Sequence, residues 1–378
     1  MSLPYRRPAF LSNGETFCDT AMRALLCDGK APQPVSVGAL SPRIGQRALL
    51  DAHANGKGGG LKLIVAAARH AGFAQLLERE GVDLLYVWRG LRGRDELGAM
   101  AARAAGIPRI YFEGGPMPGW VQIDMAGVNA RSSIPREPAF FRLWREKGPQ
   151  PRIDWRSLRD TLTVRPPRRN LVAQERRDDW SDEGPFLFCP FQMNAPRDPL
   201  PDGGWAADAG ELMAALAAAS EVLPEGWHLR AKPHPNARGT LEPLLAQHPG
   251  ARVVIDKDTN SLDQLAASRG VITVNSAMGL EAFFHDKPVI VLGESYYSGL
   301  GRTEIARSEA ELVALLKYPE ALGFDREARD DLMNFLFNDY FVRDEDLKEH
   351  RFDVARLVDR HARHQALLTE ARREAFDA

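Results

Sequence analysis

Long apolar runs and cysteines are scarce in this chain, and both absences narrow the class of protein. No stretch approaches the ~18 apolar residues that a membrane-spanning helix requires, and residues 1–7 lack the apolar core of a signal peptide. The three cysteines, Cys18, Cys27 and Cys189, are few, odd in number and not at metal-binding spacing, as is usual in a reducing compartment. We therefore expect a cytoplasmic protein.

A large charge of one sign is also missing. The formal net charge of the 378 residues is −2, so nothing indicates a global attraction to nucleic acid or to a membrane surface. The Pro/Arg stretch at 165–169 is better explained as a solvated linker than as a docking site for an anionic polymer. No paired Cys/His spacing is present, and the glycine-rich stretch 56–60 lacks the Lys-Ser/Thr of a phosphate loop. We expect no metal, no cofactor and no nucleic-acid partner.

What the chain does contain is two series of short apolar strands that alternate with helices. In the first series, segments 82–88 and 108–112 have the pattern of buried strands and flank an alanine-rich helix at 95–105. The second series has such strands at 186–189, 227–232, 251–255 and 270–274. This alternation is typical of an α/β protein with parallel sheets.

The apolar periodicity fades between residues 149 and 184, which indicates a domain boundary. We expect an N-terminal α/β domain at 1–150, a linker at 151–184, a C-terminal α/β domain at 185–325 and a helical segment at 326–378. By analogy at the level of the fold, two Rossmann-type domains facing a cleft, with C-terminal helices, form a GT-B-like architecture.

The turn after the strand 270–274 has the composition of a nucleotide-binding turn. Asn275 and Ser276 begin it, and Gly279 keeps it small, so that backbone N–H groups can approach a phosphate. Glu281 follows in the helix, where its carboxylate can accept hydrogen bonds from ribose hydroxyls. An ordinary βα turn with a capping serine is the alternative, because such signatures are common.

A second motif, Lys232-Pro233-His234-Pro235, follows the strand 227–232. The two prolines fix the backbone on both sides of His234, so the imidazole is presented rigidly at a strand end. Lys232 adds a positive charge, and the pair suits a phosphate oxygen or a leaving group. The alternative is a rigid turn with an incidental surface histidine. Together the two motifs predict nucleotide binding at the carboxyl ends of the second sheet.

A second group of candidate site residues consists of polar residues in the first series of strands and helices. Glu113 ends the strand 108–112 and precedes two glycines, a position that suits a general acid or base. A loop carboxylate without a chemical role is the alternative. Asn129, Arg131 and Ser132, with Asp124, form a dense polar group that suits a polyhydroxylated substrate.

The residues after the strand 186–189 add two candidates. Gln192 can donate and accept hydrogen bonds at once, which suits a carbohydrate hydroxyl or carboxylate. Asp198 is a candidate nucleophile or base for glycosyl transfer, although the neighbouring prolines fit a plain structural loop equally well. The loop at 294–303 is either a source of aromatic and backbone contacts or a lid without a direct role.

In combination these motifs resemble the bacterial capsule polysaccharide biosynthesis and export family. The likeness rests on segments that occur in the family's order, at 112–114, 127–136, 190–192, 232–235, 275–282 and 297–303. Characterised relatives include retaining β-Kdo transferases that use CMP-Kdo. The resemblance implies a glycosyltransferase that moves Kdo or a related acidic sugar from a CMP-sugar to a glycan or glycolipid acceptor. It also implies peripheral contact with the inner face of the inner membrane or with capsule-assembly proteins.

The resemblance further implies a role for several residues. His234 and Ser276 would contact the phosphate of the cytidine nucleotide, Glu281 its ribose, and Glu113 would act as acid or base near the transferred sugar. In relatives, an aspartate that closely follows the glutamine is the proposed nucleophile. Here Asp198 follows Gln192 at a greater spacing, so either the loop bulges to bring Asp198 into place or the nucleophile is missing.

Two rival functions stay open at this point. The first is another nucleotide-sugar or CDP-alcohol enzyme on the same fold, such as a polyol-phosphate transferase or an epimerase. The second is a non-catalytic component of capsule assembly that binds nucleotide or glycan.

Overall fold

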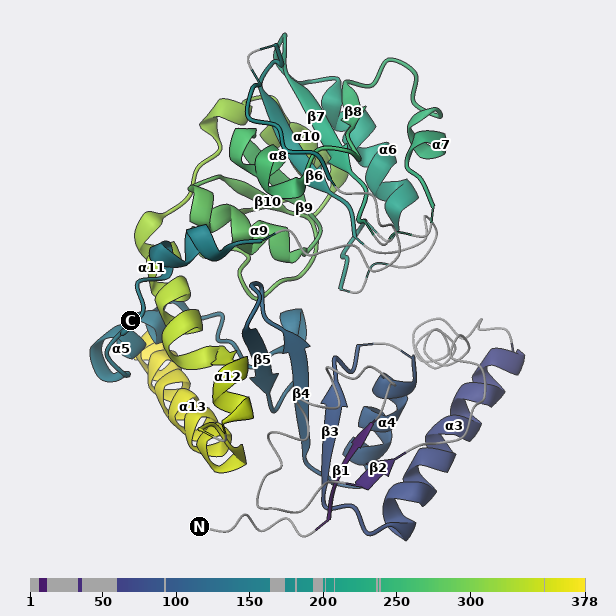
Figure 1. The fold of residues 1–378 in the computed structure, drawn as a ribbon, viewed down its shortest axis with the longest axis vertical. Coiled ribbons are helices and arrows are strands. Elements are labelled where there is room, and N and C mark those ends of the chain that lie inside the picture. Colours follow the sequence, from purple (N-terminus) through teal and green to yellow (C-terminus); the bar gives the residue numbers. More distant parts are fainter. Residues whose placement is uncertain are drawn as a thin grey trace. The chain divides into compact units, whose positions relative to one another are not determined.

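The chain folds into two compact units, each built on one six-stranded sheet (Figure 1). The first unit comprises Met1–Gln150 with Phe335–Ala378, and the second comprises Pro151–Asn334. The predicted α/β class with two Rossmann-type domains is confirmed. The computed structural model describes residues 7–11, 33–35, 60–91, 93–163, 174–180, 182–192, 200, 202–206, 208–235, 237, 239–349 and 351–377.

The sheet of the second unit is entirely parallel and has the strand order β8-β7-β6-β9-β10-β11. Its strands are β6 (Phe186–Pro190), β7 (His228–Lys232), β8 (Val253–Ile255), β9 (Gly270–Thr273), β10 (Val289–Val291) and β11 (Glu304–Ile305). The order reverses between β6 and β9, and ligands of doubly wound sheets bind outside the carboxyl ends at such a reversal. The sheet therefore places the ends of β6 and β9 at its candidate binding edge.

Helices cover this sheet because its strands carry apolar side chains on both faces. α6 (Ala209–Ser220) and α10 (Glu309–Leu316) contact each other and share one core with alternate residues of the strands. α6 begins where the carboxylate of Asp208 accepts hydrogen bonds from two backbone N–H groups of its first turn. The remaining helices of this unit are η2 (Trp155–Thr161), α7 (Glu242–Leu245), α8 (Ser261–Ala267), α9 (Ala277–Glu281), η3 (Ala282–His285) and η4 (Pro319–Ala321). α11 (Arg326–Phe335) ends at the division between the units.

The sheet of the first unit mixes strand directions. β2, β1, β3 and β4 are parallel in that order, β5 is antiparallel to β4, and β12 is antiparallel to β5. The strands are β1 (Pro8–Leu11), β2 (Gln33–Val35), β3 (Leu84–Trp88), β4 (Arg109–Gly114), β5 (Trp120–Asp124) and β12 (Val342–Arg343). β5 is not among the strands expected from the sequence. It pairs Gln122 with Glu113, so these two candidate-site segments form one hairpin.

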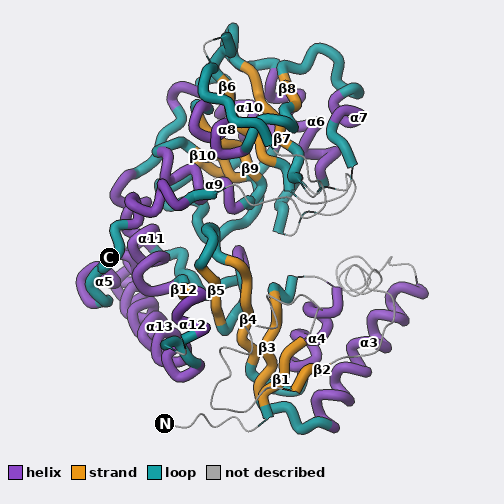
Figure 2. The backbone as a smooth tube through the Cα atoms, in the orientation of Figure 1, coloured by secondary structure: helices purple, strands orange, loops and turns teal. Residues whose placement is uncertain are grey.

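The two faces of the first sheet are covered by helices from opposite ends of the sequence (Figure 2). Leu85 and Val87 pack with α3 (Gly60–Arg79) and α4 (Gly93–Ala104). Leu84, Tyr86 and Trp88 pack with apolar residues of α12 (Asp344–Lys348) and α13 (Val354–Asp377), because successive side chains of a strand point to opposite faces. The other elements are η1 (Asn129–Arg131), α5 (Pro138–Lys147) and the π-helix η5 (Leu336–Tyr340).

The C-terminal helices therefore complete the core of the first unit. Residues 326–378 were expected to form a separate helical segment, whereas contacts place Phe335–Ala378 in the unit that begins the chain. Within the parts of the chain that the structure describes, no helix is both long enough and apolar enough to cross a membrane.

Candidate functional site

A small pocket lies at the carboxyl ends of β6 and β7. These two strands pair in register up to Pro190 and Lys232, and the N–H of Phe191 donates to the carbonyl of Lys232 at 2.9 Å. The following residues, Gln192 and His234, therefore leave the sheet next to each other, and both line the pocket. The other lining residues are Phe191, Ala209, Pro233, Ala237, Gly239, Thr240 and Leu241.

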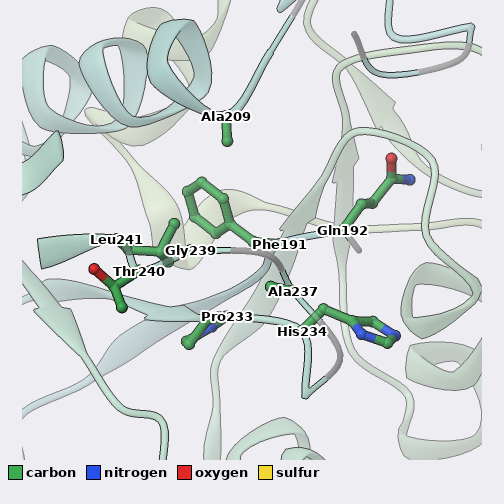
Figure 3. Close-up of a pocket in the computed structure, with 9 residues that line it drawn as sticks. All are labelled: Phe191, Gln192, Ala209, Pro233, His234, Ala237, Gly239, Thr240 and Leu241. Atoms are coloured by element: carbon green, nitrogen blue, oxygen red, sulfur yellow. The ribbon is translucent and has the colours of Figure 1, made fainter. Parts of the chain in front are cut away.

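Two polar side chains lie at one end of the pocket, and the opposite end is mostly apolar (Figure 3). Gln192 and His234 lie on one side of the close-up, and the buried side chains of Phe191 and Leu241 lie toward the other. The pocket is small and partly open, because its empty space of about 270 Å³ includes open solvent. Its polar end suits a phosphate or sugar oxygen.

Gln192 also connects the ends of β6 and β9, across the reversal of strand order. Its side-chain amide donates a hydrogen bond to Oδ1 of Asn275, and Nδ2 of Asn275 donates to the carbonyl of Asp202 at 3.3 Å. Three predicted site residues, Gln192, His234 and Asn275, are thus brought together at the edge where doubly wound sheets bind ligands.

Ser276 and Gly279 have local structural roles in the turn after β9. Ser276 caps α9, since its Oγ accepts from the N–H of Met278 at 3.3 Å and its own N–H donates to Oγ1 of Thr273 at 3.1 Å. A Cβ atom on Gly279 would lie 2.8 Å from Cζ of Tyr297, so this glycine makes room for an aromatic ring. Approach to a phosphate was the expected reason for Gly279, whereas the structure supplies a packing reason.

Glu281 is the last residue of α9 and is half-buried. The helix expected to contain it is present as α9, which spans five residues before the 3₁₀ turn η3 begins. Its carboxylate is close enough to Tyr297 to contribute to the raised pKa of that phenol, after the larger effect of burial. Its predicted contact with a ribose stays a prediction.

Lys232 was expected to contact a phosphate, but in the structure its ammonium group binds the protein backbone. Its side chain is buried, and its Nζ donates to the backbone carbonyls of Lys257 at 3.1 Å and of Thr259 at 2.5 Å. It is not among the residues that line the pocket. Burial lowers the pKa of Lys232 to about 8, although Asp256 and Asp258 oppose this effect. In this structure Lys232 anchors the loop that follows β8.

That loop contains an Asp-x-Asp pattern, at residues 256–258, which is not among the site motifs expected from the sequence. Asp256 accepts hydrogen bonds from the N–H groups of Asp258 at 3.1 Å and Thr259 at 2.9 Å, and from Arg230 at 2.7 Å. Arg230 is buried against the rings of Trp180 and Phe186 and also pairs with a glutamate. The pattern at the end of a strand was the available signal, and the contacts of Asp256 show a structural role.

Glu113 of the first unit is held at the carboxyl end of β4 by an arginine. Nε of Arg89 lies 2.7 Å from Oε2 of Glu113, whose other oxygen accepts from the N–H of Gly114 at 3.0 Å. Arg89 follows β3 with a φ of 60°, a left-handed conformation that strains a residue other than glycine. Gly90 is also left-handed, and a Cβ there would lie 2.8 Å from the ring of Tyr111. The backbone therefore holds Arg89 beside Glu113.

The polar segment 124–133 is organised by buried hydrogen bonds. Oδ2 of Asp124 accepts from Ser133, through both its N–H at 2.9 Å and its hydroxyl at 2.7 Å, and from the hydroxyl of Tyr340 at 2.6 Å. Nε2 of Gln122 donates to the same tyrosine oxygen at 2.9 Å, and its Oε1 accepts from the N–H of Asn129 at 3.1 Å. Tyr340 of the π-helix thus links the C-terminal segment to this loop.

The three predicted substrate-binding residues of this loop differ in their contacts. Asn129 has a left-handed φ of 53°, Arg131 pairs with Glu96 of α4 at 3.3 Å, and the hydroxyl of Ser132 donates to the carbonyl of Asn129 at 2.7 Å. The Arg131 guanidinium is partly exposed. Their roles in substrate binding stay predictions.

Asp198, the predicted nucleophile, lies outside the residues that the structure describes. Among the described residues, no group of three or more His, Cys, Asp and Glu side chains is arranged to hold a metal ion. The expectation that no metal or cofactor is needed therefore stays a prediction.

The comparison with protein families agrees with the site in the second unit. Residues 167–316 match the family described as capsule polysaccharide biosynthesis protein, which confirms the resemblance. The matched residues include Gln192, His234, Asn275 and Glu281, whereas Glu113 lies outside them.

One curated protein is similar to part of the chain. The chain is 28% identical over 248 residues to Protein FixF of Sinorhizobium fredii (strain NBRC 101917 / NGR234), covering 65% of this chain and 57% of that protein. The chain thus spans just over half the length of this curated relative.

Two solved structures of Thermosulfurimonas dismutans KpsC are similar to the chain. The β Kdo 2,4 transferase has a TM-score of 0.47 and 17% identity, over 87% of this chain and 97% of that chain. The β Kdo 2,7 transferase has a TM-score of 0.46 and 12% identity, over 93% of this chain and 98% of that chain.

Proposed function

We propose that this protein is a glycosyltransferase of capsule or surface polysaccharide synthesis. The donor is a CMP-sugar, the transferred group is Kdo or a related acidic sugar, and the acceptor is a glycan or glycolipid. The observation that carries the proposal is the meeting of Gln192, His234 and Asn275 at the reversal of strand order in a unit that matches the capsule family. The reaction takes place in the cytoplasm, with or without peripheral contact to the inner membrane.

The chemistry assigned to the second unit is stabilisation of a departing nucleotide. As the bond between the sugar and the CMP phosphate breaks, negative charge grows on a phosphate oxygen. A positioned donor such as His234 is most effective at that moment, because it is already oriented by its two flanking prolines. Gln192 and Ser276 contribute uncharged polar groups, and Glu281 accepts hydrogen bonds from the ribose hydroxyls.

The chemistry assigned to the first unit concerns the acceptor. Glu113, fixed beside Arg89, is the candidate acid or base for proton transfer at the reacting hydroxyl. Asn129, Arg131 and Ser132 are the candidate contacts to the polyhydroxylated acceptor. Asp198 is the candidate nucleophile of a double displacement with retention of configuration, in which a glycosyl-enzyme ester forms and is then attacked by the acceptor.

A thermal-shift panel with CMP, CDP, UMP, UDP, ADP and GDP tests the donor. A nucleotide at a hundred times its dissociation constant adds about 2.7 kcal/mol to the free energy of unfolding. We expect selective stabilisation by CMP, and loss of that stabilisation in Glu281→Ala. CMP-Kdo, incubated with the protein and an acceptor glycan, should then release CMP.

The alternatives give different results in the same panel. Preferential stabilisation by a nucleoside diphosphate would replace the CMP-sugar donor with another nucleotide-sugar or a CDP-alcohol. Stabilisation by CMP without turnover of any CMP-sugar would indicate a non-catalytic binding protein. No response to any of the six nucleotides would contradict the proposed function.

A further inference from the structure

The loop after β10 reaches back to the turn after β9 through one buried tyrosine. Tyr297 is 1% exposed, and its hydroxyl donates a hydrogen bond to the carbonyl of Ser276 at 2.6 Å. Burial raises the pKa of this phenol, so the hydroxyl keeps its proton and remains a donor. The carbonyl of Ser276 also accepts from the N–H of Gly279 at 3.0 Å. One peptide group of the turn is therefore held from two sides.

Gly279 and Tyr297 fit each other closely. A Cβ at position 279 would lie 2.8 Å from Cζ and 2.9 Å from Cε2 of the Tyr297 ring, distances that atoms in packed proteins avoid. Tyr297 also packs edge-on against Phe283 at a centroid distance of 6.1 Å. The ring thus has one place in which its hydroxyl reaches Ser276.

A left-handed turn fixes the loop just beyond Tyr297. Gly299, Leu300 and Gly301 have φ values of 71°, 56° and 77°. Consecutive left-handed residues are rare, and Leu300 is strained because its Cβ crowds the following carbonyl. The turn is closed by a hydrogen bond from the N–H of Arg302 to the carbonyl of Gly299 at 3.0 Å, while Oγ1 of Thr303 accepts from the N–H of Gly299 at 2.9 Å.

Two buried arginines hold the far end of the same loop to α11. Nε of Arg302 donates to the carbonyl of Ala328 at 3.2 Å, and Nε of Arg329 donates to the carbonyl of Arg302 at 2.9 Å. Arg329 in turn stacks on the ring of Phe324. Tyr297 therefore reaches the β9 turn from a loop that is restrained by hydrogen bonds within its own turn and to α11.

We propose that Tyr297 is a positioning residue for the nucleotide site. By fixing the Ser276 carbonyl it holds the turn that carries Asn275, which in turn fixes the amide of Gln192 at the polar end of the pocket beside His234. This inference rests on the proposed function for its ligand. The mechanical part, that the hydroxyl restrains the turn, can be tested without any nucleotide.

The test compares Tyr297→Phe with Ser220→Ala. Each variant deletes one buried hydroxyl of the second unit; that of Ser220 donates to the carbonyl of Ala217 and accepts from the N–H of Arg252, away from the pocket. The first measurement is hydrogen exchange of the amides at 276–282 in the free proteins. We expect at least a fivefold faster exchange in Tyr297→Phe and no change in Ser220→Ala.

The second measurement is the dissociation constant for CMP, by titration calorimetry well below the melting temperature of each variant. We expect at least a fivefold weaker affinity for Tyr297→Phe and wild-type affinity for Ser220→Ala. Unchanged exchange, or unchanged CMP affinity despite a lowered melting temperature, would show that the tyrosine is merely structural and would overturn the inference. If the wild-type protein did not bind CMP but exchange still rose in Tyr297→Phe, the proposed donor would fail and the restraint of the turn would stand.

Discussion

Arg89 and Glu113 form an ion pair with a separation of 2.7 Å at the ends of two neighbouring parallel strands. The pair joins a half-exposed guanidinium to a carboxylate that is 14% exposed, and the left-handed backbone of Arg89 holds it there. Strained conformations of this kind persist where the surrounding structure enforces them, often at functional sites. The ion pair therefore fixes the Glu113 carboxylate at the strand end, where its role as an acid or base stays a prediction.

Replacement of Glu113 should separate transfer from nucleotide binding. Glu113→Gln removes the proton-transferring group, so we expect transfer from CMP-Kdo to fall by about 10²-fold or more. Stabilisation by CMP should be unchanged, because the predicted nucleotide contacts belong to the second unit. Glu137→Gln, which alters another ion-paired glutamate of the first unit, is the control. Wild-type transfer by Glu113→Gln would remove this residue from the mechanism.

His234→Ala should lower transfer by well over tenfold, about the effect of losing one positioned donor to a developing charge. The reason is that His234 shares the polar end of the pocket with Gln192. His248→Ala, in the same unit but outside the pocket, should keep wild-type activity. The measurement is release of CMP in the presence of acceptor, and equal rates for the two variants would contradict the assignment.

Lys232 should make the stability of the protein depend on pH in the alkaline range. Its folded-state pKa of about 8 is below the ordinary value of 10.5, so between these values the unfolded chain binds more protons at this site. Stability from this group therefore rises as the pH increases from about 8 to 10.5, by at most about 3 kcal/mol. Urea unfolding of wild type and Lys232→Met across this range should show the difference between them growing with pH. A difference independent of pH would contradict the burial of a charged ammonium.

Tyr340→Phe should destabilise the first unit and disturb the polar segment 124–133, which carries the proposed contacts to the acceptor. The hydroxyl donates to Asp124 and accepts from Gln122 inside the core. Its loss removes the acceptor for the Gln122 amide and one of the donors to Asp124, at a cost of about 1–3 kcal/mol. We expect a lower melting temperature, reduced transfer and unchanged affinity for CMP. Tyr318→Phe, at a side chain that is 72% exposed, should behave as wild type. Equal melting temperatures for the two variants would count against the network.

Much of the second unit could be predicted from local patterns. Buried strands such as Phe186–Pro190 and Gly270–Thr273 are short apolar runs bounded by turn residues, and their order along the chain predicts parallel pairing. The turn motifs at Asn275 and His234 could be placed at carboxyl ends for the same reason. Gln192 brings the two motifs together, since it is hydrogen-bonded to Asn275 and lines the pocket with His234. This arrangement depends on pairing between strands far apart in sequence, which local periodicity does not encode.

The candidate site of the first unit was less predictable. The sequence predicted Glu113 as a site residue, but its partner Arg89 follows another strand and is brought close by the register of β3 and β4. Asp124 was expected to face a substrate, and the structure surrounds it instead with Ser133 and Tyr340. The sequence pattern around a carboxylate in a polar segment is the same whether it contacts a substrate or the protein core. The difference lies in the side chains that contact it after folding.

By itself the sequence determined the α/β class, the positions of most strands and the motifs that match the capsule family, because periodicity and turn chemistry are local properties of the chain. Tertiary structure alone decided that the C-terminal helices complete the first unit. Only in the tertiary structure does the ammonium of Lys232 donate to two backbone carbonyls. Likewise, only there does the ring of Tyr297 leave no room for a side chain at position 279. Each of these outcomes depends on contacts between residues distant in sequence, whose burial and spacing exist only once the sheets have formed.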